Sequence, residues 1–146
     1  MSQQQDYKVE LSFSCHCGFM KCKTKQKSLK PVSSDSPLEL TVLDCNCSMC
    51  RRKGFLHHIV SEKNFQSPNE LSQLHSYSFQ THVAKHYFCP VCGICTFYKP
   101  RSNPDGWSVN FRCIDDESAK LVKHVVELFD GQNWEENGQK IKHLSE

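Results

Sequence analysis

The chain has few apolar residues once its cysteines are set aside. Hydrophobic residues, cysteine included, make up 38% of the 146 residues, and ten of them are cysteines. The other apolar residues amount to about 31% of the chain, against roughly 45–50% in typical globular domains. We expect one domain over residues 1–146, with a core at about 7–135 and a tail at 136–146. With so few apolar residues for a core, we expect cysteines that bind a ligand to contribute to stability.

The sequence also lacks a charge excess and long hydrophobic runs. Lysine and arginine number 18 and aspartate and glutamate 16, so the formal net charge is only +2. This charge does not indicate a nucleic-acid partner. No run approaches the ~18 apolar residues of a membrane span, and the start, MSQQQDYKVE, has no basic n-region or apolar h-region. We therefore expect an intracellular protein, cytoplasmic or nuclear, without a membrane partner.

An intracellular location changes the interpretation of the ten cysteines. Glutathione and thioredoxin keep thiols reduced inside cells. Ten cysteines in such a chain therefore indicate metal ligands or reactive thiols rather than disulfides. We expect their spacing to carry the function.

Alternation of apolar and polar residues predicts a mainly β protein. Residues 7–13 show the period of two that is typical of a half-buried strand, and residues 21–27 alternate in the same way. Further strands are predicted at 38–43, 55–60, 74–79, 85–88, 96–98 and 107–112.

One helix is predicted near the C-terminus. Five apolar residues share one helical face there, with Ser118 as the expected N-terminal cap and Gly131 near the expected end. The apolar residues of this face are Leu121, Val122, Val125, Val126 and Phe129.

Seven of the ten cysteines have the spacing of metal ligands. CHCG at 15–18 and CPVCG at 89–93 each end in a glycine, which tolerates the positive φ of a tight turn around a metal. A closed zinc site needs four ligands, and these two turns supply four thiolates. Two ordinary turns with free thiols would leave both glycines unexplained. We therefore predict a structural zinc held by Cys15, Cys17, Cys89 and Cys92.

The C-x-C-x-x-C motif at Cys45, Cys47 and Cys50 offers three thiolates and no obvious fourth ligand. Three protein ligands with an open position are typical of a catalytic zinc. A thiol substrate that bound there would be deprotonated. The alternative is a second closed site, whose fourth ligand would be a leftover cysteine or one of His57, His58, His82 and His86.

Two arginines directly follow this motif. Arg51 and Arg52 could bind the carboxylates of an anionic substrate. The alternative is that they belong to a solvated basic turn, because surface charges are often only surface charges.

These motifs, in this order and spacing, resemble the glutathione-dependent formaldehyde-activating enzyme family. The resemblance rests on CHCG, DCNCSMCRR, HYFCPVCG and NFRCID, and it runs from about Phe13 to Glu135. Within the family, the sequence bears a closer resemblance to the corresponding domain of animal centromere protein V. That closer likeness rests on LDCNCSMC, YSFQTHVAKHYFC, FYKPRSNPDG and FDGQNWE.

The resemblance implies a zinc-stapled β-tent similar to Mss4, built of short antiparallel sheets, to which the predicted C-terminal helix is added. It implies two zinc ions per chain, a structural one on the two glycine-terminated turns and a labile, catalytic one on Cys45, Cys47 and Cys50. Family members are described as carbon–sulfur lyases or synthases that join glutathione and formaldehyde into S-hydroxymethylglutathione.

The expected substrates are therefore a small thiol, glutathione, and formaldehyde or a related aldehyde. Arg51 or Arg52 would orient the carboxylates of the tripeptide. The alternative function is a non-catalytic zinc-binding module of the centromere protein V type, which would bind a chromosomal or cytoskeletal partner.

Overall fold

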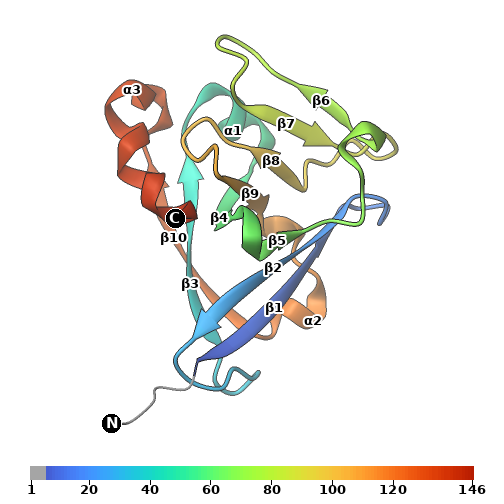
Figure 1. Cartoon of the computed structure of the whole chain (residues 1–146), viewed down its shortest axis with the longest axis vertical. Helices are drawn as coiled ribbons and strands as arrows, with labels where there is room; N and C mark the ends of the chain where they lie inside the picture. The colour runs from blue at the N-terminus through green and yellow to red at the C-terminus, as the bar shows by residue number, and fades with distance from the viewer. Residues whose placement is uncertain (1–5) are drawn as a thin grey trace.

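The mainly β prediction is confirmed by a computed structural model, which describes residues 6–146 (Figure 1). A three-stranded sheet has the order β1-β2-β5. A seven-stranded sheet has the order β10-β3-β4-β9-β8-β7-β6. The strands are β1 (Tyr7–Ser14), β2 (Lys21–Ser28), β3 (Leu38–Cys45), β4 (Leu56–Ser61), β5 (Phe65–Gln66), β6 (His75–Tyr77), β7 (Lys85–Phe88), β8 (Phe97–Lys99), β9 (Gly106–Asn110) and β10 (Val122–Phe129).

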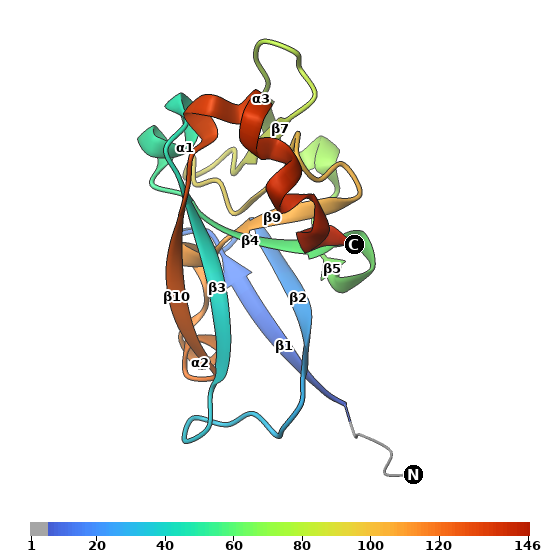
Figure 2. The ribbon, with the colours of Figure 1, turned by 90° about the vertical axis from the view of Figure 1, so that its left-hand side faces the viewer.

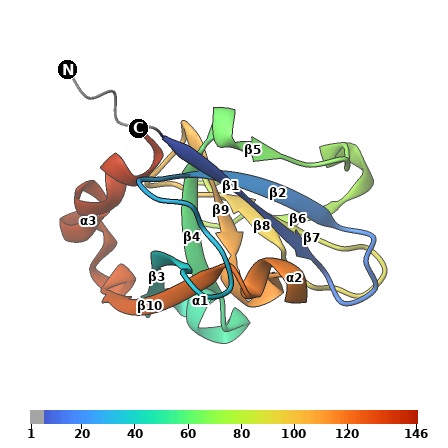
Figure 3. The same cartoon turned by 90° about the horizontal axis from the view of Figure 1, so that it is seen from below.

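The core lies between the two sheets. Strands β1 and β2 form an antiparallel hairpin with Phe13 opposite Cys22, and this hairpin crosses over β9 and β8 in Figure 3. Its apolar face packs into one cluster with the larger sheet, including Phe97 and Val109. The lysines of β2 alternate with the buried Cys22 and Thr24 and stay exposed, as the period of two predicts.

The prediction of a helix over residues 118–129 is wrong. A short helix, α2 (Asp116–Ala119), is followed by β10, which pairs in parallel with β3 along its whole length (Figure 2). The residues at helical spacing include three valines, and β-branched residues favour strands. Val125 and Val126 stay 49% and 46% exposed, so the helical spacing does not mark a stripe that faces the core.

The expected ends of that helix have other roles. Ser118 lies within α2, where its hydroxyl accepts a hydrogen bond from the backbone N–H of Ser12 at 2.8 Å. Gly131 begins a 3-10 turn, and the C-terminal helix is α3 (Trp134–Asn137). The predicted fold class therefore holds, with a shorter and later helix and with one parallel strand pair in the larger sheet.

A short helix that the residue pattern did not predict, α1 (Ser48–Lys53), follows β3. Short 3-10 segments complete the secondary structure. They cover Glu62–Asn64, Leu71–Gln73, Phe111–Cys113, Gly131–Asn133 and Gly138–Ser145. Among the described residues, no helix is long and apolar enough to cross a membrane.

The last 3-10 segment packs against the larger sheet. The fully buried Asn103 donates from Nδ2 to the backbone oxygens of Ile141 and Lys142 at 2.9 and 3.0 Å. A side chain at Gly106 would lie 2.3 Å from the backbone oxygen of Val60 and 2.5 Å from Cβ of Ser145. This close approach packs the C-terminal segment against strands β4 and β9.

Candidate active site and metal centres

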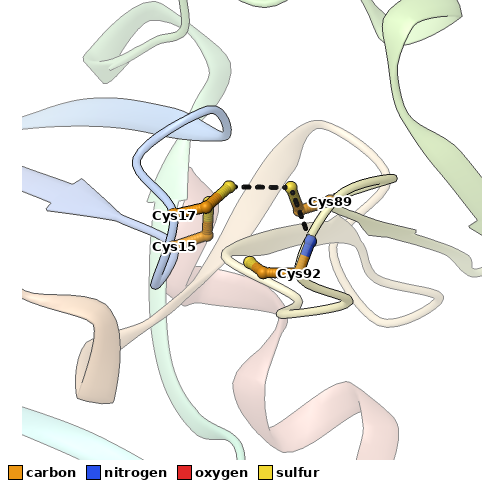
Figure 4. Close-up of side chains that lie close together, drawn as sticks. All are labelled: Cys15, Cys17, Cys89 and Cys92. Atoms are coloured by element: carbon orange, nitrogen blue, oxygen red, sulfur yellow. Dashed lines mark hydrogen bonds between the residues drawn. The ribbon is translucent and has the colours of Figure 1, made fainter.

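Two turns bring together the four-cysteine cluster, which consists of Cys15, Cys17, Cys89 and Cys92 (Figure 4). Its sulfur atoms all lie within 4.8 Å of one another, and the sulfurs of Cys17 and Cys89 are 3.5 Å apart. One turn follows β1 and the other follows β7, so the cluster joins the two sheets.

The backbone of both turns supports thiolates. Gly18 and Gly93 adopt φ values of +85° and +77°, as predicted for turns around a metal. The N–H groups of Val91 and Cys92 donate to the Cys89 sulfur at 3.3 and 3.4 Å. Burial opposes ionisation of the Cys92 thiol, but backbone N–H groups and the neighbouring thiols hold its pKa below the usual value. Four cysteine sulfurs this close together could hold one metal ion.

The three-cysteine cluster consists of Cys45, Cys47 and Cys50, whose sulfurs also lie within 4.8 Å of one another. Cys45 ends β3 and Cys50 lies in α1. Cys47 is the N-terminal cap of α1, and its sulfur accepts a hydrogen bond from the N–H of Cys50 at 3.3 Å. Hydrogen bonds from the two other thiols and from this backbone lower the pKa of the Cys47 thiol far below its usual value.

No histidine joins the three-cysteine cluster among residues 6–146. His57 comes nearest, with Nε2 at 3.2 Å from the Cys50 sulfur, but it does not belong to the group of donor atoms that lie within 4.8 Å of one another. The three other candidate histidines have hydrogen-bond partners elsewhere. These are Thr24 for His58, Ser78 for His82 and Lys53 for His86. The described residues therefore offer three ligands here, which suits a site with an open position.

Gly131 lies directly against this cluster. A Cβ at this position would be 2.3 Å from the Cys45 sulfur and 3.2 Å from Cβ of Cys47. Real Cβ contacts are never this short, so glycine is required here for close packing. The segment after β10 therefore covers one side of the cluster.

A cavity of about 430 Å³ opens beside the three-cysteine cluster. Its volume lies within the range of small-molecule sites. It is bounded by α1, β4, β8, the loop at 79–84 and the C-terminal segment at 129–141. The three cysteines line it together with His57, His86, Phe79, Tyr98, Arg101, Trp134 and Glu135, among others.

Tyr98 and His57 form a buried polar group on the cavity wall. The Nδ1 atom of His57 is 2.8 Å from the Ser108 hydroxyl and 3.3 Å from the Tyr98 hydroxyl. Burial and the nearby Lys53 ammonium lower the pKa of His57 to about 3, so its ring is neutral. When Cys50 is a thiolate it can only accept, which places the ring proton on Nε2 and leaves Nδ1 to accept from a hydroxyl.

The two arginines predicted to bind substrate lie outside the cavity. Arg51 and Arg52 are exposed on α1 and do not line it. Arg52 donates from Nη1 to the backbone oxygen of Ser48 at 2.9 Å. The next residue, Lys53, turns inward instead, with Nζ 2.9 Å from Nδ1 of His86 and 3.3 Å from the sulfur of Cys95.

Arg101 is a cationic residue that lines the cavity, and no motif spacing predicted a role for it. The same is true of Tyr98, Gly131 and Trp134. Their motifs, FYKPRSNPDG and FDGQNWE, contributed to the family resemblance. Spacing alone does not show that these segments meet beside the cysteines.

The similarities to known proteins agree with this geometry. Residues 10–132 match the family model described as glutathione-dependent formaldehyde-activating enzyme. A crystal structure of a Rhodobacter sphaeroides protein is 26% identical, with a TM-score of 0.55, and the match covers 78% of this chain and 99% of that chain. The region matched by the family model contains both cysteine clusters, Tyr98 and Arg101, and it ends before Trp134 and Glu135.

Proposed function

Because this chain belongs to the glutathione-dependent formaldehyde-activating enzyme family, we propose that it joins a thiol to an aldehyde and cleaves the adduct in the reverse direction. The proposed substrates are glutathione and formaldehyde or a related aldehyde, and the reaction class is that of a carbon–sulfur lyase or synthase. The observation that carries this proposal is the cavity of about 430 Å³ with three cysteine sulfurs on its wall.

The proposed metal at both clusters is zinc. Thiolate sulfur suits zinc, and a closed four-thiolate site is typical of a structural ion. Cys45, Cys47 and Cys50 would hold the second ion, which supplies an open position that favours the ionised form of a bound thiol. The neutral His57 would donate from Nε2 to Cys50 and so orient that ligand.

The proposed reaction balances without an oxidant or a reductant. The thiol sulfur forms a bond to the carbonyl carbon, the C=O π pair moves to the oxygen, and the proton lost by the thiol ends on that oxygen. Tyr98 would donate a hydrogen bond to the developing oxyanion. Burial and the nearby cysteines hold the pKa of Tyr98 well above its ordinary value, so its hydroxyl keeps its proton.

Removing the Tyr98 hydroxyl is expected to slow the chemical step. Tyr98→Phe should lower kcat about 100-fold, the typical cost of one oxyanion donor, while KM for glutathione changes less than twofold. The measurement is the initial rate of adduct formation after subtraction of the uncatalysed rate. Tyr87→Phe is the matched control, because Tyr87 does not line the cavity. An unchanged kcat would remove Tyr98 from the proposed mechanism.

The two clusters should lose their zinc ions one after the other. A graded chelator titration of the zinc-loaded protein is expected to remove one ion per chain before any loss of β structure, because a three-ligand site binds its metal less firmly than a closed site tied to folding. Elemental analysis and circular dichroism on the same samples measure this order. Simultaneous loss of both ions would contradict the division into four and three ligands.

Gly131→Ala is expected to weaken the second zinc selectively. The added methyl group would force the Cys45 sulfur to move, and a disturbed ligand environment typically costs 10- to 100-fold in metal affinity. Competition with a chromogenic chelator measures the affinity of the weaker ion. Wild-type affinity in this variant would show that the segment after β10 does not constrain the cluster.

The activity itself is tested with a panel of aldehydes and thiols. Glutathione and formaldehyde combine without help, so each rate is compared with the uncatalysed background and with the Cys47→Ser variant. Acceleration of at least one pair by the wild-type protein alone supports the proposal. A rate equal to the background for every pair would overturn it.

A non-catalytic interaction module is not favoured as an alternative. Family membership and the cavity beside the cysteines both support small-molecule chemistry. The particular likeness to centromere protein V and the chromosomal or cytoskeletal partner that it would imply stay predictions.

A further inference from the structure

The cavity has one sulfur-lined wall and one charged wall. Among its described lining residues, Arg101 is the one lysine or arginine and Glu135 the one carboxylate. The two lining histidines already have partners within the protein, His57 at Ser108 and His86 at Lys53. A charged substrate group in this cavity would therefore meet Arg101 or Glu135.

Arg101 is held in place by the C-terminal segment. Its guanidinium carbon lies 3.7 Å from the ring centroid of Trp134, a close cation–π contact. Its Nη2 donates to Oε1 of Glu135 at 2.8 Å. The Arg101 side chain is 29% exposed and that of Glu135 is 78% exposed, so the arginine is the more fixed partner and the carboxylate is the more freely moving one.

This arrangement leaves Arg101 able to bind a further carboxylate. A guanidinium carries five N–H donors in a planar fork, and the bond to Glu135 uses one of them. An exposed ion pair is worth little, so a substrate carboxylate could share or replace Glu135 at low cost. The Glu135 carboxylate would then be free to accept from an ammonium group.

We propose that Arg101 and Glu135 bind the zwitterionic amino-acid end of the thiol substrate, with its α-carboxylate on Arg101 and its α-ammonium on Glu135. Trp134 is the positioning residue that holds Arg101. This inference rests on the proposed function, and it names Arg101 in place of Arg51 and Arg52 as the carboxylate-binding residue. Glutathione carries such an end on its γ-glutamyl residue, whereas a simple thiol such as 2-mercaptoethanol has none.

Binding of S-methylglutathione tests the subsite apart from thiol chemistry, because this probe has no free thiol. Calorimetry on the zinc-loaded protein is expected to show an affinity that falls about 10- to 100-fold in Arg101→Gln. Arg101→Lys keeps the charge but loses the planar fork, so it should bind with intermediate affinity. Arg112→Gln, at an exposed position that does not line the cavity, should bind as the wild type does.

A second probe tests the ammonium contact. The analogue of S-methylglutathione without its α-amino group should bind the wild type about threefold more weakly, and Glu135→Gln should remove this difference. Equal binding of the two probes by the wild type would overturn the assignment of the amino-acid end. Trp134 fluorescence should change when either probe binds, because its ring stacks on Arg101.

Several outcomes overturn the inference. They are no detectable binding of S-methylglutathione by the wild type, wild-type affinity in Arg101→Gln, or loss of affinity in Arg52→Gln instead. If Arg101→Gln does not fold, Arg101→Lys and Glu135→Gln carry the same test. Binding through Arg101 without acceleration of any thiol–aldehyde pair would support this subsite and overturn the proposed function, so the two failures are distinguishable.

Discussion

Cys89→Ser is expected to leave little folded protein. The four-cysteine cluster joins the β1–β2 sheet to the larger sheet, and it links Cys17 to Cys89 across 72 positions. Closing a loop of this size is worth about 4 kcal/mol by the entropy argument used for disulfides. Whole domains are stable by only about 5–15 kcal/mol, and this chain has few apolar residues to compensate. Soluble yield and thermal melts followed by circular dichroism measure the effect.

The matched control for this variant is Cys113→Ser. Cys113 is half-buried and belongs to neither cluster, so the same chemical change should leave the melting temperature close to that of the wild type. Cys17→Ser should behave as Cys89→Ser does, because both residues serve the same cluster. Cooperative melting of Cys89→Ser at wild-type stability would refute a structural role for the four-cysteine cluster.

Cys47→Ser is expected to separate function from folding. The motif from Cys45 to Cys50 closes no long loop, so the loss of a metal bound there should cost little stability. Serine is also a good N-terminal cap, and its hydroxyl can accept from the N–H of Cys50 in place of the sulfur. The variant should keep a wild-type β spectrum and one bound zinc, while thiol–aldehyde turnover falls to the uncatalysed rate.

Cys47→Ala refines this test. Alanine cannot cap α1, so this variant should also lose about 1 kcal/mol of stability without losing its sheets. Metal content, circular dichroism and turnover are measured on all three proteins. If Cys47→Ser unfolds, the three-cysteine cluster is structural, and a closed site with a fourth protein ligand becomes the better interpretation.

The sequence predicted the cysteine clusters well because their geometry is local. One or two residues separate neighbouring ligands within each turn, and Gly18 and Gly93 mark the positive φ values that such turns need. The four sulfurs of the first cluster could be paired across the chain because a closed site needs four ligands. Most strands were predicted for a similar reason, since the alternation of apolar residues is read over a few positions.

The parts that were missed depend on contacts between distant segments. Strand β10 has helical spacing in its apolar residues, but it pairs with the distant β3 along its whole length. Arg101 lies between β8 and β9. Its place on the cavity wall depends on Trp134, which follows β10 in the chain. Arg51 and Arg52 were close to the cysteines in sequence, but the turn of α1 directs them into solvent.

The parallel pairing of β3 with β10 has a consequence for the order in which the chain can fold during synthesis. Val122 pairs with Leu38, so β3 lacks this neighbour until β10 has been made, although β4 follows β3 closely in the chain. At the ~5–20 residues per second of translation, the 72 positions between Cys17 and Cys89 alone take roughly 4–14 s. The three-cysteine cluster is complete in the nascent chain well before the four-cysteine cluster. The thiols of the first half therefore emerge from the ribosome without the partners that bury them, and a ribosome-bound chain stopped before Cys89 should remain open to thiol-alkylating reagents.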